Sequence, residues 1–269
     1  MFRKKILFIG LLAGLSISAF AHFQLIHTED SDVSGKASVP FELFFSHPAD
    51  GTEAHSMDIG KDEKGKIQPV VDFFSVHNGE KINLTKNLVA SQFGGDKKVS
   101  AYKFNLDRNT GLKGGGDWGL VFVPAPYYEG SEDIYIQQVT KVFVNKDDIP
   151  TDWSERIAEG YPEIVPLTNP ITWKNQIFRA QVVDKEGKPV PNAEIEVEYL
   201  NADIKNSMFV GKNKEEKAAT VILTDANGYF SFVPIHEGFW GFAALGAGGE
   251  QEHNGKELSQ DAVLWIEAK

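Results

Sequence analysis

The chain has no cysteine among its 269 residues and only three methionines. Disulfide bonds, thiolate metal sites and cysteine nucleophiles are therefore excluded, and a methionine-rich copper site is disfavoured. The sequence also lacks the His-Glu-x-x-His, Gly-x-Ser-x-Gly and phosphate-loop motifs. No motif thus indicates a hydrolase or a nucleotide-binding enzyme, and we expect a protein that is not an enzyme.

Basic residues are scarce as well. The formal net charge is −11 at pH 7, and removal of residues 1–21, which carry three basic residues and no acidic one, changes it to −14. Nucleic acid and anionic lipid are poor partners for such a chain because both select basic surfaces. Acidity permits the binding of cations but does not predict it, since many soluble proteins are acidic.

Residues 1–21 have the features of a cleaved signal peptide. A basic start is followed by an apolar stretch over 6–20 and by Ala19-Phe20-Ala21, a small-x-small cleavage signal. The apolar stretch is short for a membrane span, and an uncleaved anchor is the alternative. No later segment is apolar enough to cross a bilayer. We expect export to a bacterial periplasm, with an extracellular location as the alternative.

Cleavage after Ala21 would make His22 the N-terminal residue, with a free α-amine beside its imidazole. These two nitrogens can close a chelate ring on one divalent ion. His47 ends an apolar strand, and His55 lies in the loop that follows it. Amine and imidazole nitrogens suit Ni²⁺, Co²⁺, Cu²⁺ and Zn²⁺. The sequence therefore predicts a metal site at His22, His47 and His55.

His77 stands at the start of the Asn78-Gly79 turn, from which we expect it to reach the same end of the protein. It is the fourth candidate ligand, whereas roles for His236 and Met57 stay open. For His77 and His236 an ordinary surface histidine is the competing interpretation. Met57 has core packing as its competing interpretation.

Alternating apolar residues predict an all-β protein with two β-sandwich-like domains. We expect an N-terminal metal-binding domain over 22–150, a linker over 151–172 containing a short helix around 152–158, and a second sandwich over 173–269. Asn78-Gly79 predicts a tight hairpin because both positions tolerate positive φ. In the second domain, Glu194, Glu196 and Glu198 alternate with apolar residues and predict a solvent-facing side. Expected strands cover 23–26, 39–45, 70–76, 98–104, 118–123, 135–144, 178–184, 194–200, 238–244 and 262–267, and residues 224–232 are expected to form a turn followed by a further strand.

Two resemblances add to this interpretation. Residues 173–269 resemble the transthyretin-like or carboxypeptidase-regulatory-like β-sandwich, which is commonly a structural module. Most of the mature chain is similar to a domain-of-unknown-function family linked to periplasmic components of nickel and cobalt uptake systems. The similar segments are Ala21-His22-Phe-Gln, Phe45-Ser-His47-Pro, His55-Ser-Met57-Asp-Ile-Gly60, Val123-Pro-Ala-Pro-Tyr-Tyr-Glu129 and Gly238-Phe-Trp-Gly-Phe242.

The second resemblance implies a periplasmic accessory protein that binds Ni²⁺ and captures it for, or delivers it to, the subunits of a membrane importer of the energy-coupling-factor type. His22, His47 and His55 occupy the histidine positions of that pattern. Two alternatives stay open: a copper-dependent oxidase with an N-terminal histidine brace, and a non-catalytic extracellular scaffold module. The sequence alone does not select the metal, because geometry and supply decide selectivity.

Overall fold

The computed structural model describes residues 22–51, 60–211, 213–215 and 217–269. Within these residues the fold is all-β, as expected, and its one helical element is the short 3₁₀ helix η1 (Thr85–Asn87). No helix in the described part of the chain is long and apolar enough to cross a membrane.

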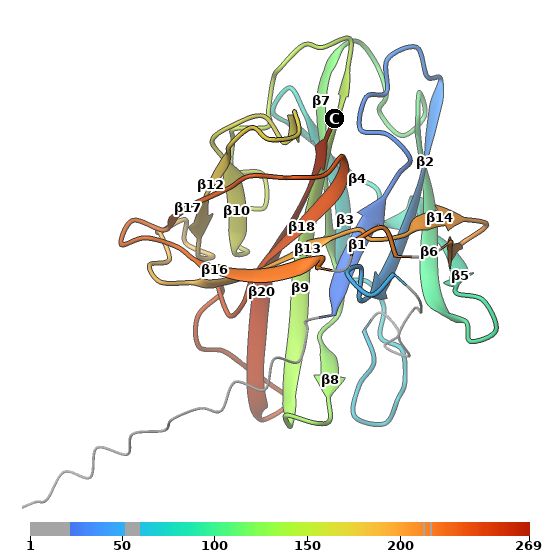
Figure 1. The fold of residues 1–269 in the computed structure, drawn as a ribbon. Helices are drawn as coiled ribbons and strands as arrows, with labels where there is room; N and C mark the ends of the chain where they lie inside the picture. Colours follow the sequence, from blue (N-terminus) through green and yellow to red (C-terminus); the bar gives the residue numbers. More distant parts are fainter. Residues whose placement is uncertain (1–21, 52–59, 212, 216) are drawn as a thin grey trace, which may run out of the picture.

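A large central sheet runs through the molecule (Figure 1). Its strand order is β16-β13-β18-β20-β9-β7-β3-β4, and β8, β11 and β19 pair at its margins. The strands are β3 (Asp72–His77), β4 (Glu80–Asn83), β7 (Gly116–Val123), β8 (Tyr127–Glu129), β9 (Ile134–Lys146), β11 (Ile171–Thr172), β13 (Glu194–Tyr199), β16 (Ala219–Leu223), β18 (Gly238–Ala244), β19 (Glu252–His253) and β20 (Lys256–Ala268).

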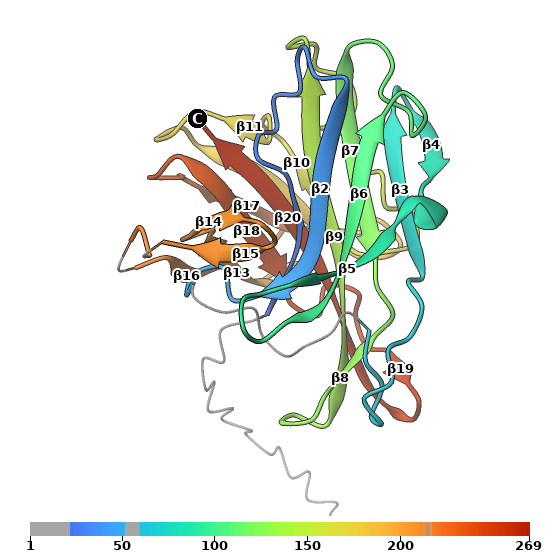
Figure 2. The ribbon, with the colours of Figure 1, turned by 90° about the vertical axis from the view of Figure 1, so that its right-hand side faces the viewer.

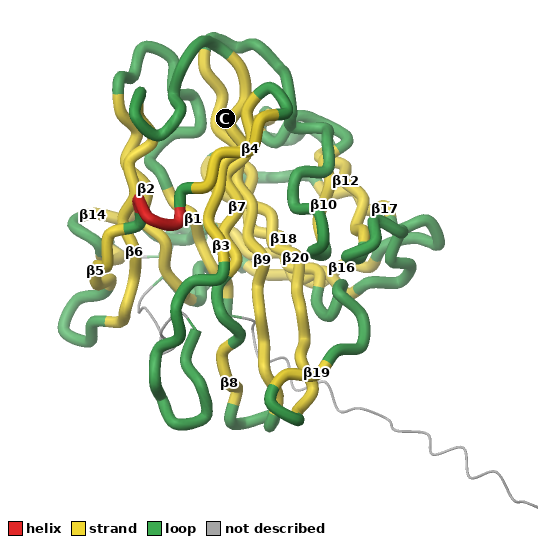
Figure 3. Tube along the Cα trace, turned by 180° about the vertical axis from the view of Figure 1, so that it is seen from behind, coloured by secondary structure: helices red, strands yellow, loops and turns green. Residues whose placement is uncertain are grey.

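Two smaller sheets cover the two faces of the central sheet, one on its left and one on its right in Figure 1. One has the order β1-β2-β6-β5 and the other β10-β12-β17. A separate hairpin, β14-β15, completes the fold (Figure 3). These strands are β1 (Phe23–His27), β2 (Ser38–Ser46), β5 (Val89–Phe93), β6 (Val99–Asp107), β10 (Glu163–Pro166), β12 (Phe178–Val183), β14 (Asp203–Lys205), β15 (Met208–Val210) and β17 (Tyr229–Phe232).

Side-chain alternation explains why the central sheet is buried on both faces. Phe73 and Trp265 pack in the core under β1 and β2, whereas their neighbours Phe74 and Leu264 pack in the core under β12. Successive residues of a strand point to opposite faces, so these strands need apolar residues at nearly every position. This requirement accounts for apolar runs such as Leu120–Val123 in β7.

The two halves of the chain share this sheet. β20 lies between β18 and β9 and pairs with β9 in parallel, with Leu258 opposite Tyr135 and Trp265 opposite Val142. The sandwich-like character is thus present, but the central layer is common to both halves. The domain boundaries at 150 and 173 stay a prediction.

The helix expected around 152–158 is wrong, because the segment forms turns. Two of its backbone donors bind a side chain outside the segment, because the carboxylate of Glu163 accepts the N–H groups of Ile157 and Ala158 at 3.1 and 2.9 Å. The hairpin expected at Asn78-Gly79 is confirmed, with φ of 50° and 74° at these residues.

Candidate functional site

His22 and His47 are neighbours across the open end of the β1–β2 pair. The antiparallel register places Phe23 opposite Ser46, so one further residue on each strand brings His22 opposite His47. Their imidazole rings lie with centroids 4.2 Å apart and planes inclined by 40°. Two histidines separated by 24 intervening residues therefore present their side chains at one point.

A turn anchored on β13 holds the chain just after His47. The N–H groups of Asp50 and Gly51 donate to the carbonyl oxygen of His47 at 3.1 and 3.2 Å. Gly51 has a φ of +57°, and a Cβ there would lie 2.8 Å from the Cβ of Ala202. Glycine is thus required both by the backbone conformation and by the close approach.

Three hydrogen bonds tie this turn to β13 and the residues after it. Ala49 donates its N–H to the carboxyl of Glu198 at 2.9 Å. The backbone N–H of Asn201 donates to the carbonyl of Pro48 at 3.0 Å, and its side-chain amide donates to the carbonyl of Ala49 at 2.8 Å. The position of His47 therefore depends on residues that lie about 150 positions later in the chain.

Glu198 corrects one expectation from the sequence. The alternation of Glu194, Glu196 and Glu198 predicts a solvent-facing side of the strand, but Glu198 is buried with 1% exposure. Burial raises the pKa of Glu198 to about 8. Its carboxyl group is therefore mostly protonated and neutral at pH 7.

A pocket of about 230 Å³ lies beside His22. Its walls come from β8, β9, β13 and β20 and from the loops next to them. Four carboxyl groups line it, those of Glu129, Glu132, Glu196 and Asp261. Among the described residues that line the pocket there is no lysine or arginine, so it favours a cation over an anion.

Asp261 forms the inner part of this pocket. Burial raises the pKa of Asp261, while the N–H of Gly246 and the hydroxyl of Ser259, at 2.9 and 2.7 Å, act in the opposite direction by stabilising the carboxylate. Tyr127 faces the same space, and burial together with Asp261 raises the pKa of its phenol. Gln138, also in the wall, accepts the backbone N–H of Gln24 at 2.8 Å and so connects the pocket to β1.

His77 does not lie with the pair. Its ring stacks on Trp118 at 3.9 Å with planes 7° apart, its Nδ1 lies 2.8 Å from the carbonyl oxygen of Asp117, and its Nε2 lies 2.9 Å from the amide of Asn78. Trp118 is opposite Val144 on β9, six residues beyond the Gln138 that lines the pocket.

At about 3.3 Å per residue this separation is roughly 20 Å along the strand. The expectation that His77 reaches the same end of the protein is therefore wrong. The β3–β4 hairpin lies at the upper end of the molecule in Figure 2, and β8 lies at the lower end. The error arose because a turn signal predicts a hairpin but does not say at which end of the sheet it lies.

His236 is also placed elsewhere. Its Nδ1 lies 3.3 Å from a carboxylate oxygen of Glu215, and its ring is parallel to that of Trp240. It also packs against Tyr199, which points to the opposite face of β13 from Glu198. His55 and Met57 fall outside the described residues, and their roles stay predictions. Among the residues that the structure describes, no three His, Asp or Glu side chains form a group suited to hold a metal ion.

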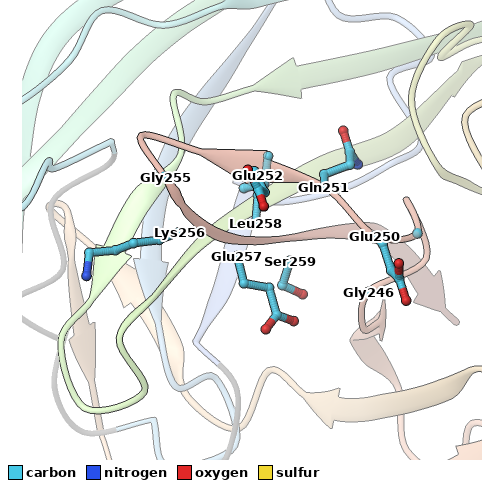
Figure 4. Close-up of a pocket in the computed structure, with 10 residues that line it drawn as sticks. Gly246, Glu250, Gln251, Glu252, Gly255, Lys256, Glu257, Leu258 and Ser259 are labelled. Carbon is cyan, nitrogen blue, oxygen red and sulfur yellow. The ribbon is translucent and has the colours of Figure 1, made fainter.

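A larger hollow of the described structure is at a different place. It has a volume of about 810 Å³ and follows the β19–β20 hairpin over residues 246–259 (Figure 4). Glu250, Lys256 and Glu257 project from it in different directions, and no histidine lines it. Its groups do not converge, so we place the candidate site at His22 and His47.

A family model described as "Domain of unknown function (DUF4198)" matches residues 19–248. The chain belongs to this family. No curated protein matches it.

Solved structures give only distant likenesses. The human OSCAR ligand-binding domain is 12% identical, with a TM-score of 0.20 and coverage of 90% of this chain and 97% of that one. The Yersinia pseudotuberculosis adhesin InvE is 12% identical, with a TM-score of 0.20 and coverage of 90% and 58%. The Bacillus cereus major pilin subunit BcpA is 9% identical, with a TM-score of 0.18 and coverage of 91% and 71%. Similarities of this size say nothing about function.

Proposed function

We propose that the His22–His47 end binds a divalent transition metal ion as cargo, with Ni²⁺ as the leading candidate. The observation that carries the proposal is the cross-strand contact of the two imidazole rings at 4.2 Å. In the proposed site, the α-amine and imidazole of His22 close a chelate ring after cleavage behind Ala21. His47 supplies a third nitrogen, and nitrogen ligands of these types suit Ni²⁺, Co²⁺, Cu²⁺ and Zn²⁺.

The acidic pocket beside His22 supports the same proposal. Its carboxyl groups raise the local concentration of cations next to the two histidines. Glu196 lines the pocket beside His22 and lies on the same face of β13 as Glu198. The carboxyl group of Glu198 in turn binds the N–H of Ala49 in the turn after His47. A site assembled from β1, β2 and β13 is pre-organised by the sheets, which lowers the ordering cost of binding.

The protein in this proposal is a non-catalytic periplasmic accessory that captures Ni²⁺ or delivers it to a membrane importer. A site at the end of a strand pair is accessible from outside the fold, as transfer to a partner requires. The nickel assignment itself rests on the resemblance described under Sequence analysis and on the nitrogen donor set.

A copper oxidase is the second candidate, and the donor set favours it to a degree. One amine and two imidazoles on one ion match the ligand set of a histidine brace, and copper binds most nitrogen sites more tightly than nickel. The two proposals differ in reactivity, because only the oxidase consumes dioxygen together with a reductant and oxidises a polysaccharide.

The test uses processed, untagged protein purified from the periplasm. Native mass spectrometry and calorimetry with Ni²⁺, Co²⁺, Cu²⁺ and Zn²⁺ should show one ion per chain, and cells lacking the protein should accumulate less nickel. The absence of any bound ion in protein whose N-terminus is His22 would reject the site. Release of oxidised sugars by copper-loaded protein with a reductant would replace the accessory function with the oxidase.

A further inference from the structure

The strand β16 is an open edge of the central sheet. It pairs with β13 on one side and stands at the end of the strand order. Its sequence is Ala-Thr-Val-Ile-Leu, and Val221 and Leu223 are 52% and 62% exposed. Edge strands are commonly protected by lysine, proline or a bulge, because unpaired backbone groups attract other strands. This strand has no lysine or proline.

The backbone of β16 presents hydrogen-bonding groups outward at every second residue. Tyr199 donates its N–H to the carbonyl of Ala218, and Thr224 donates its N–H to the carbonyl of Ala193, so the even-numbered residues of this segment face β13. The groups of Ala219, Val221 and Leu223 therefore point away from β13. Within the described residues, no backbone hydrogen bond other than strand pairing involves these three.

Charges flanking the strand select one way of closing this edge. In an antiparallel pair of two β16 strands centred on Val221, Ala219 lies opposite Leu223 of the second copy. Lys217 then lies opposite Asp225 of the second copy, and both residues are exposed. A twofold pair contains this opposite-charge contact twice, and each such cross-strand pair is favourable.

We propose that β16 pairs antiparallel with β16 of a second copy of this chain, in the register centred on Val221. The pairing joins two central sheets into one and supplies about six backbone hydrogen bonds from the outward-facing residues. Two short strands bury less than the roughly 1,200 Å² typical of stable complexes, so the dimer is weak and forms in the micromolar range or above.

Sedimentation velocity on the processed chain, from about 1 to about 300 μM, measures this association. EDTA is present throughout, so the result is independent of metal binding. We expect a concentration-dependent monomer–dimer equilibrium. Val221→Pro removes an outward N–H that β13 does not use, and it should weaken the dimer at least about tenfold without loss of fold. Val221→Thr keeps this N–H and is the matched control.

Charge exchange tests the register. Lys217→Glu and Asp225→Lys each create two like-charge contacts and should weaken self-association about tenfold. An equimolar mixture of the two variants restores both opposite-charge contacts and should dimerise as the wild type does. Asp225 also accepts the N–H groups of Asn227 and Tyr229, so folding of its variant is checked by circular dichroism.

If Asp225→Lys does not fold, Lys217→Glu alone decides the register, since Lys217 is exposed. A wild type that stays monomeric at every concentration overturns the proposal. A dimer dissociation constant that is unchanged by Val221→Pro or by Lys217→Glu overturns the proposal as well, because association would then use another surface or register.

Discussion

The carboxyl group of Glu198 accepts the N–H of Ala49 at 2.9 Å, two residues beyond His47. A residue of the C-terminal half thereby fixes the turn that positions a candidate ligand in the N-terminal half. Glu198 is buried, so this hydrogen bond lies in an environment that favours the neutral carboxyl group.

We predict that Glu198→Gln stabilises the protein at neutral pH. Burial raises the pKa of Glu198 from 4.5 in the unfolded chain to about 8, so the folded state holds a proton that the unfolded state releases between these values. Stability therefore falls as pH rises through this window. The amide still accepts the N–H of Ala49 and carries no charge. The gain at pH 7 should be on the order of 3 kcal/mol, with little gain at pH 4.

Urea unfolding at pH 4 and pH 7 measures this gain. Glu194→Gln is the control, because Glu194 lies on the same face of β13 and is exposed. If Glu198→Gln and Glu194→Gln show the same pH dependence, the carboxyl group of Glu198 is not the source of the effect.

The next prediction concerns the two sequence-predicted histidines that the structure separates. His47→Ala should weaken Ni²⁺ binding more than about tenfold, since it removes one nitrogen from a small ligand set. His77→Ala should change the affinity by less than about twofold, because its ring is engaged by Trp118, Asp117 and Asn78 away from the pair. Calorimetry on both variants measures this contrast, and equal losses would contradict the two-histidine site.

The α-amine can be tested without changing a side chain. One alanine inserted before His22 moves the amine away from the imidazole and should weaken Ni²⁺ binding by about tenfold or more. Intact-mass measurement identifies the start of the processed chain, which should be His22 in the wild type. Affinity that is unchanged in a chain shown to begin with the extra alanine would remove the amine from the ligand set.

The buried ion pair between Lys141 and Glu163 should be critical for stability. These side chains are 3% and 2% exposed, and burial lowers the pKa of Lys141. Glu163→Gln leaves the ammonium group without its counter-charge and should cost about 3–5 kcal/mol in unfolding free energy. Glu237→Gln is the control, because solvent screens the exposed Lys174–Glu237 pair and its loss should hardly change the unfolding free energy. The double variant Lys141→Met/Glu163→Gln also removes the ammonium group and shares with Glu163→Gln the same amide facing the N–H groups of Ile157 and Ala158. If urea denaturation shows that it is as unstable as Glu163→Gln alone, the unpaired ammonium group is not the source of the loss.

Local patterns predicted the longer strands of the two cores, because alternation and the Asn78-Gly79 turn are properties of a few neighbouring residues. They did not predict short strands such as β5, β10 and β16. The pairing of His22 with His47 required the register of β1 and β2, which the sequence does not state. The expectation that Glu198 is exposed was wrong. Alternating glutamates indicate that one face of the strand is solvated, but the turn after His47 covers the end of that face where Glu198 lies. The sequence also does not show that Asp261 and Gln138 are neighbours. The parallel pairing of β20 with β9 brings them together, and this pairing joins segments far apart in the chain.

The central position of β20 has a consequence for how the protein reaches its final state. Residues 256–268 lie between β18 and β9, so neither core can close until this segment is available. A nascent chain that lacks this segment cannot pair β18 and β9 with β20, so its central sheet stays incompletely folded. If the protein is exported as we propose, this delay keeps the polypeptide able to pass through a narrow translocation channel until residues 256–268 have been made, and the sheet then assembles on the far side of the membrane.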